Sequence, residues 1–155
     1  MNRIEVINSI LEKHPNSIVF LSNGLTSREA AFYNLQDRCF YMLHAMGETL
    51  SVAIGFAQCK PDMDIVVIDG DGNALMGLSS WNMMPVSNIT YYVIANGISE
   101  TTGGQKLSSL PIIPSWCNVI EFEKYKRDTP NPPQPFSIYE STINWIQEQS
   151  KNKLL

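Results

Sequence analysis

Residues 65–73 are Ile-Val-Val-Ile-Asp-Gly-Asp-Gly-Asn. The first four are apolar and β-branched, which is typical of a strand buried on both faces of a parallel sheet. Glycines on both sides of Asp71 permit an unusual turn and let a ligand approach the backbone closely. A helix that begins here would direct backbone N–H groups at an anion. The stretch therefore predicts a central strand of an α/β fold, with a polar turn at its carboxyl end.

A second strand and turn follow along the chain. Residues 90–95, Thr-Tyr-Tyr-Val-Ile-Ala, form another apolar run and precede Asn96-Gly97. A short helical stretch near Ala74 to Met84 lies between the two runs. Strand, helix and strand within about 30 residues predict a parallel crossover. Because neighbouring parallel strands end at the same edge of a sheet, we expect Asp71 and Asn96 to meet there.

The rest of the chain extends this pattern to one α/β domain over residues 1–155, a three-layer α/β/α fold with a mainly parallel sheet. The other expected elements are a helix over the first dozen residues, a strand at 17–21, a helix at 28–36 capped by Thr26 or Ser27, a helix at 48–59, a strand at 118–122, and a last helix from Ser137 to Gln149.

Composition excludes several classes of protein. Of 155 residues, 44% are hydrophobic and 17% are charged, and the net charge of −4 argues against nucleic-acid binding. No apolar run is long enough to cross a bilayer, and the N-terminus shows no apolar signal segment. The three cysteines are odd in number and widely spaced, unlike a disulfide framework or a zinc site. We therefore expect a cytoplasmic protein.

The two turns together favour a metal site. One carboxylate, one amide oxygen and a loop carbonyl are part of a Mg²⁺ shell, which phosphate oxygens and water would complete. Gly-Asp-Gly alone fits a tight turn with a solvated carboxylate, and Asn-Gly alone is a common turn. Both turns at this spacing, each after a buried strand, favour a site for a metal and a diphosphate.

Four stretches carry a resemblance to a known family. Residues 24–29, 40–47, 67–76 and 96–105 resemble the thiamine-diphosphate enzymes of the pyruvate-decarboxylase and acetolactate-synthase superfamily. The similarity is greater to the cofactor-binding (C-terminal) domain of phosphonopyruvate decarboxylases and to the cofactor-binding subunit of sulfopyruvate decarboxylases. The stretches keep the family's order and approximate spacing.

The resemblance implies a role for each matching position. The Asp71 and Asn96 side chains and the Ile98 carbonyl would ligate Mg²⁺. Met46 would support the bent form of the cofactor, and the carbonyl of His44 would accept a hydrogen bond from its amino group. A core methionine and an ordinary polar histidine are the alternatives. The remaining residues that we expect to bind the cofactor are Thr26, Gly70, Gly72 and Asn73.

Glu100 and Ser99 are the candidate catalytic residues. The resemblance places Glu100 near the reacting centre, with a solvated loop glutamate as the alternative. Ser99 stands where relatives often carry histidine or tyrosine, so proton transfer or substrate choice is expected to differ. Residues 101–105 match the family's loop over the active site. Two other features depart from the family. Ala95 stands where the family usually has an acidic or amide residue, and the stretch from Lys106 to about Asn118 is much shorter than usual, so we expect a fold that is shortened at its C-terminal half.

The resemblance implies half of an active site. In these enzymes a separate pyrimidine-binding domain supplies the glutamate that activates the cofactor, and nothing in this chain resembles that domain. We therefore expect a partner subunit, a hetero-oligomer, and a 2-oxo acid such as phosphonopyruvate or sulfopyruvate as substrate. Met42, Met46, Met76 and Trp81 are candidates for an apolar partner surface. The alternatives are a carboligase or synthase subunit, and a non-catalytic regulatory paralogue.

Overall fold

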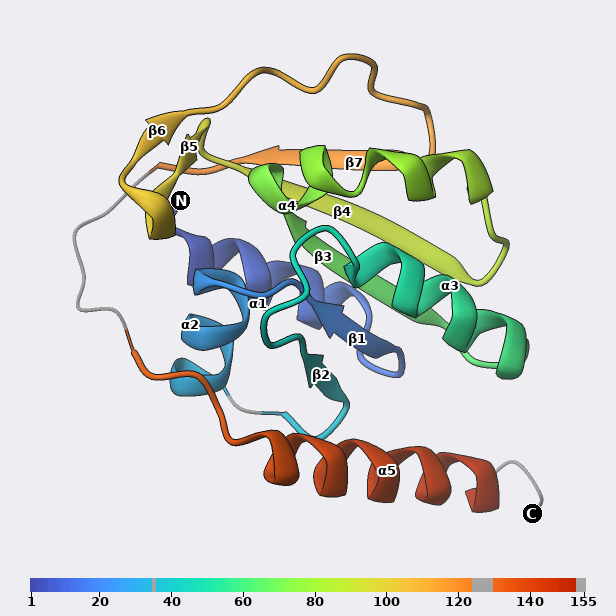
Figure 1. The fold of residues 1–155 in the computed structure, drawn as a ribbon. Coiled ribbons are helices and arrows are strands. Elements are labelled where there is room, and N and C mark those ends of the chain that lie inside the picture. The colour runs from blue at the N-terminus through green and yellow to red at the C-terminus, as the bar shows by residue number, and fades with distance from the viewer. Residues whose placement is uncertain (35, 124–129, 153–155) are drawn as a thin grey trace.

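The computed structural model describes residues 1–34, 36–123 and 130–152, and its centre is a five-stranded sheet (Figure 1). The strand order is β2-β1-β3-β4-β7, and every neighbouring pair is parallel. The predicted parallel sheet is therefore confirmed. The strands are β1 (Ile18–Leu21), β2 (Cys39–Tyr41), β3 (Ile65–Gly70), β4 (Ile89–Ala95) and β7 (Cys117–Glu121).

Side chains of the central strands alternate between two apolar cores, one on each face of the sheet. Val66 and Ile68 pack on one face with α1 (Arg3–Lys13) and α2 (Leu25–Tyr33). Ile65 and Val67 pack on the other with α3 (Thr49–Cys59), α4 (Asp71–Met76) and η1 (Leu78–Met83). This arrangement confirms the three-layer α/β/α fold, and it explains why the first four residues of β3, Ile65 to Ile68, are all apolar.

The C-terminal helix α5 (Pro135–Asn152) lies beside β2 at one edge of the sheet (Figure 1). Ile138 packs into the core of α1 and α2, whereas Trp145 and Ile146 pack against the core of α3. At the opposite edge, β7 follows an irregular segment over residues 107–116. Among the described residues, no helix is both long and apolar enough to cross a membrane.

Two predicted helix caps are wrong. The helix α2 begins at Leu25, and its N-cap is Gly24, which has a φ of 79°. Thr26 and Ser27 therefore lie inside the first turn, where the Ser27 hydroxyl donates to the Leu21 carbonyl instead of capping the helix. The helix α5 begins at Pro135, because proline suits a first helical turn. The hydroxyl of Ser137, the other predicted cap, donates to the Gln134 carbonyl.

The helix predicted near residues 74–84 is two helices, α4 and η1, that meet at Gly77. A Cβ at Gly77 would lie 2.3 Å from the carbonyl oxygen of Gly47, so only glycine allows this close approach. Three short strands were not predicted, because two or three residues show no periodicity. They are β2, β5 (Ile98–Ser99) and β6 (Gln105–Lys106), and the last two pair as an antiparallel hairpin.

The order of the strands locates a ligand crevice. The chain runs from β1 outward to β2, then returns across β1 to form β3 on its other side. Ligands of open α/β sheets bind beyond the carboxyl ends of the strands at such a reversal of strand order. The loops that follow β1 and β3 are therefore the place to look for a site.

Candidate active site

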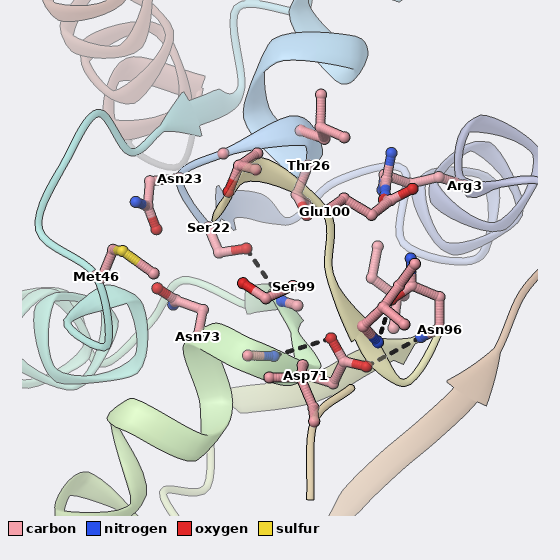
Figure 2. Close-up of a pocket in the computed structure, with 18 of the residues that line it drawn as sticks. Arg3, Ser22, Asn23, Thr26, Met46, Asp71, Asn73, Asn96, Ser99 and Glu100 are labelled. Carbon is pink, nitrogen blue, oxygen red and sulfur yellow. Dashed lines mark hydrogen bonds and ion pairs between the residues drawn. The ribbon is translucent and has the colours of Figure 1, made fainter. Parts of the chain in front are cut away.

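A pocket lies at this carboxyl edge, and the loops after β1, β3 and β4 line it (Figure 2). The loop after β1 contributes Ser22 to Thr26, and the start of α4 contributes Asp71 to Asn73. Residues from Asn96 to Thr101 close one side, and Met46 lies on the opposite side of the pocket from Asn96. The fold thus brings together four segments that are far apart in the sequence.

The Asp71 carboxylate is fixed by backbone N–H groups. Its Oδ2 atom accepts hydrogen bonds from the amides of Asn96, at 3.0 Å, and Gly97, at 2.7 Å. Its Oδ1 atom accepts one from the Gly72 amide at 2.9 Å. These bonds join the end of β3 to the end of β4, which confirms that Asp71 and Asn96 meet at one edge. Figure 2 shows the carboxylate in the pocket wall beside Asn96.

Asn96 brings a further oxygen atom to the pocket, and Ile98 lies beside it. The Asn96 Oδ1 atom accepts a hydrogen bond from the Ile98 amide at 3.2 Å, and both residues line the pocket. An amide oxygen has two lone pairs, so one remains for another partner. Within the described ranges, no three His, Cys, Asp or Glu side chains form a metal-binding cluster. A cation here would therefore also need amide, carbonyl or phosphate oxygens.

A second polar cluster is buried beneath the pocket. The Asp69 carboxylate, 2% exposed, accepts hydrogen bonds from Asn73 Nδ2 at 2.6 Å and from the Tyr91 hydroxyl at 3.0 Å. Asn73 Nδ2 also donates to the Thr49 hydroxyl at 3.0 Å, and Asn73 Oδ1 accepts from the Gly47 amide at 2.6 Å. Burial raises the pKa of Asp69 to about 6, since desolvation penalises the carboxylate more than these hydrogen bonds favour it.

The loop that carries Met46 has an uncommon backbone. His44 and Ala45 have φ angles of 60° and 45°, and Gly47 has a φ of 85°. Met46 is 43% exposed and reaches the pocket. His44 is exposed and is not among the residues that line the pocket, so the role expected for its carbonyl stays a prediction.

The candidate catalytic residues lie on η2 (Glu100–Thr102) and just before it. The Glu100 carboxylate pairs with Arg3, whose guanidinium also pairs with Glu29 at 2.9 Å. That guanidinium lies 4.9 Å from the centre of the Phe122 ring. The Ser99 hydroxyl is 2.6 Å from the hydroxyl of Thr102. The pairing with Arg3 ties the loop of Glu100 to the start of α1.

The structure therefore places nearly all predicted site residues in one pocket. Sequence reasoning missed Arg3 and Ser22, whose hydroxyl accepts a hydrogen bond from the Gly70 amide at 3.0 Å. Nothing in the sequence indicated that Arg3 lines a pocket, because it stands in an ordinary amphipathic helix. Ser22 directly follows a buried strand, and this position at the carboxyl end of a strand could have identified it as a candidate site residue. The lining residues that were predicted are Thr26, Met46, Gly70, Asp71, Gly72, Asn73, Asn96, Ile98, Ser99 and Glu100.

The chain is similar in sequence to a known family and to known enzymes. Residues 22–112 match the family described as "Thiamine pyrophosphate enzyme, C-terminal TPP binding domain". The chain is 37% identical over 123 residues to phosphonopyruvate decarboxylase of Streptomyces hygroscopicus, covering 74% of this chain and 30% of that protein. It is 35% identical over 108 residues to sulfopyruvate decarboxylase subunit beta of Methanocaldococcus jannaschii, covering 67% of this chain and 57% of the relative.

A solved structure shares the fold. The 2-oxoglutarate:ferredoxin oxidoreductase from Magnetococcus marinus, solved with 2-oxoglutarate, coenzyme A and succinyl-CoA bound, superposes with a TM-score of 0.52 and 23% identity. The match covers 67% of this chain and 37% of that chain. At this identity the likeness concerns the fold alone. This chain thus spans less than two thirds of the length of each of these proteins.

Proposed function

Because this chain belongs to the thiamine pyrophosphate enzymes, through their C-terminal TPP-binding domain, we propose that it holds thiamine diphosphate with Mg²⁺ for the decarboxylation of a 2-oxo acid. The observation that carries the proposal is the junction of Asp71 with Asn96 and Gly97 at the carboxyl edge of β3 and β4. It gathers oxygen atoms beside the start of α4, in a pocket at the reversal of strand order.

The charges around the pocket support a metal ion. Its charged lining residues are Asp71, Glu100 and Arg3, and Arg3 already pairs with two carboxylates. An anionic diphosphate would be repelled unless a cation accompanied it. The carboxylate of Asp71, the amide oxygen of Asn96 and the carbonyl of Ile98 are hard ligands that suit Mg²⁺. The donor set therefore fits the proposed ion.

Each part of the pocket would have a separate task. Bound thiamine diphosphate supplies a carbon nucleophile and an electron sink for loss of CO₂ from a 2-oxo acid. Asp71, Asn96 and Ile98 would hold the metal ion, and Thr26, Gly70, Gly72 and Asn73 would surround the diphosphate. Met46 would press the cofactor into its bent form, and the His44 carbonyl would accept from its amino group. Glu100 would move a proton near the reacting centre, and Ser99 would adjoin the substrate.

The names of the relatives support an acidic substrate and a partner. One relative is a phosphonopyruvate decarboxylase and another a sulfopyruvate decarboxylase subunit beta, so we propose a 2-oxo acid with a second acidic group. We further propose a separate pyrimidine-binding subunit, which would complete the active site. Met46 and Met76, 43% and 62% exposed, both line the pocket and would face that subunit. The structure corrects one other candidate, since Met42 is 7% exposed. Trp81 is half-buried and packs against Tyr91 and Trp116, and its place on a partner surface stays a prediction.

Cofactor binding and CO₂ release test the proposal. We expect calorimetry to show Mg²⁺-dependent binding of thiamine diphosphate that tightens when a pyrimidine-binding subunit is added. The pair should release CO₂ from sulfopyruvate or phosphonopyruvate, whereas the purified chain alone should not. Consumption of the 2-oxo acid with an acyl acceptor as co-substrate would favour the carboligase alternative. Failure of the chain to bind the cofactor, with and without the subunit, would refute the proposal.

A further inference from the structure

The helix α4 connects the two ends of the pocket. Its first residue, Asp71, lies at the proposed metal site, and its C-terminal end lies against the loop of Met46. A Cβ added at Gly47 would lie 3.0 Å from the Met76 carbonyl carbon and 3.1 Å from the Gly77 amide nitrogen. The loop and the end of α4 are therefore in direct backbone contact, and the position of Met46 depends on that of α4.

The Met46 loop, residues 44–47, needs contacts with the rest of the protein to keep its backbone conformation. A left-handed backbone costs an ordinary residue about 1–2 kcal/mol, and His44 and Ala45 both adopt it. Such conformations persist only when the surrounding structure enforces them. At Gly47 the chain is buried, and the Gly47 amide donates a hydrogen bond to the side-chain oxygen of Asn73, at 2.6 Å. This hydrogen bond ties the loop to α4.

The orientation of the Asn73 side chain is set by its other two partners. Its Nδ2 group donates one hydrogen to Asp69 Oδ1 and one to the Thr49 hydroxyl. An amide nitrogen has two hydrogens to donate, so both are used. The carbonyl oxygen of the side chain must then face Gly47. Asn73 is 6% exposed, and both of its amide hydrogens are used within the protein, so its side chain has no donor left for a diphosphate.

We infer that Asn73 is a positioning residue, whose side chain fastens the Met46 loop to α4 instead of binding the cofactor. Asp69 and Thr49 hold its amide in the orientation that this task requires. The inference rests on the proposed function, since it assigns Met46 to the cofactor. It also refines the prediction for Asn73: only the backbone of this residue remains to approach the diphosphate, while Asp71, two positions earlier, holds the metal ion.

Hydrogen exchange at the Gly47 amide tests the inference on the full chain without a cofactor. We expect this amide to exchange slowly in the natural protein and about tenfold to a hundredfold faster in Asn73→Ala, because a buried hydrogen bond is lost. Thr49→Val keeps the shape of the side chain but removes the hydroxyl, so we expect faster exchange there as well. Thr49→Ser is the matched control, since it restores the hydroxyl and should restore slow exchange.

Cofactor binding and turnover then separate positioning from ligation. With the pyrimidine-binding subunit, Asn73→Ala should lower kcat about tenfold or more, while the affinity for Mg²⁺ and thiamine diphosphate changes less than in Asp71→Ala. Unchanged exchange at Gly47 in Asn73→Ala would overturn the inference. A loss of cofactor affinity equal to that of Asp71→Ala would overturn it too, because it would mark the Asn73 side chain as a ligand. If the natural chain bound no cofactor, the proposed function would fail, while exchange at Gly47 would still decide whether Asn73 fastens the loop.

Discussion

Asp69 and Asp71 stand two positions apart in one motif, yet they belong to different regions of the molecule. Asp69 is buried beneath the pocket and is held by the side chains of Asn73 and Tyr91. Asp71 is half-buried in the pocket wall and is held by the backbone amides of Gly72, Asn96 and Gly97. The first carboxylate organises the interior, and the second faces the place where a ligand would bind.

The difference arises at the junction of β3 with α4. Residues two apart on a strand point to the same face. Here the strand ends at Gly70 and the helix begins at Asp71, so the second carboxylate turns out of the sheet toward β4. The comparison shows that two aspartates of one motif can have different roles: Asp69 stabilises the fold, and Asp71 is placed to bind a ligand. The predictions below test that division, from the largest expected effect to the smallest.

Replacement of Asp71 should have the largest effect on binding. In Asp71→Ala we expect Mg²⁺-dependent binding of thiamine diphosphate to be lost, with the affinity reduced at least about a hundredfold, as a charged metal ligand is removed. Stability should fall by only about 1 kcal/mol, because the freed amides can bond to water. Calorimetry and thermal unfolding measure the two effects. Unchanged cofactor affinity would refute the assignment of Asp71 to the metal.

Replacement of Asp69 should instead reduce stability. Asp69→Leu leaves Asn73 Nδ2 and the Tyr91 hydroxyl without their buried acceptor, which costs about 2–4 kcal/mol. For a chain of this size we expect Tm to fall by roughly 5–15 °C. Asp69→Asn is the matched control, since its carbonyl oxygen can accept from Asn73 and its amide can donate to Tyr91. A loss of cofactor affinity without a loss of stability in Asp69→Leu would contradict the division.

The pH dependence of stability provides a third test, in the absence of metal and cofactor. Burial raises the pKa of Asp69 from an ordinary 3.8 to about 6, so the folded state favours the protonated form. This contribution to stability is complete below pH 4 and is lost as the pH rises through about 6. Asp69→Asn does not titrate, so its stability relative to the natural chain should increase over that range, by roughly 2–3 kcal/mol. Urea unfolding at several pH values would show a constant difference if Asp69 does not titrate in this way.

The smallest expected effect is that of Tyr91→Phe. The Tyr91 hydroxyl donates to Asp69 Oδ2, and its removal leaves a carboxylate that Asn73 still satisfies in part. We expect a loss of about 1–2 kcal/mol in the free energy of unfolding and less than a twofold change in cofactor affinity. Denaturant unfolding and calorimetry measure the two quantities. A large change in affinity would place Tyr91 in the binding site rather than below it.

The sequence was sufficient to predict the elements of the fold that have a clear hydrophobic pattern. Ile65 to Ile68 is apolar throughout, and a strand buried on both faces requires that, so β3 and its place in the sheet were predictable. The meeting of Asp71 and Asn96 followed from the geometry of parallel strands. The role of Asp69 was not predictable, because Tyr91, which donates to its carboxylate, lies on another strand. Thr49, which accepts from the same Asn73 amide group, lies on α3, and these side chains come together only in the folded chain.

Other features were hidden for local reasons. A serine or threonine before a helix predicts a cap, but Gly24 can adopt a positive φ and starts α2 earlier than Thr26. The strand β2 has three residues, too few to show alternation. Arg3 reaches the pocket through pairing with Glu29 and Glu100, which are distant in sequence. Such contacts depend on the packing of distant segments, so the spacing of residues in the sequence does not predict them.

The position of α5 has a consequence for how the chain folds. Because Ile138 enters one core while Trp145 and Ile146 enter the other, this single helix adds to the stability of both faces of the sheet. Loosening either core would free part of the same helix and expose apolar surface of the other. The two layers should therefore unfold in one cooperative transition rather than in sequence. During synthesis neither core would be complete until α5 has been made, so both would gain their final contacts from the same helix.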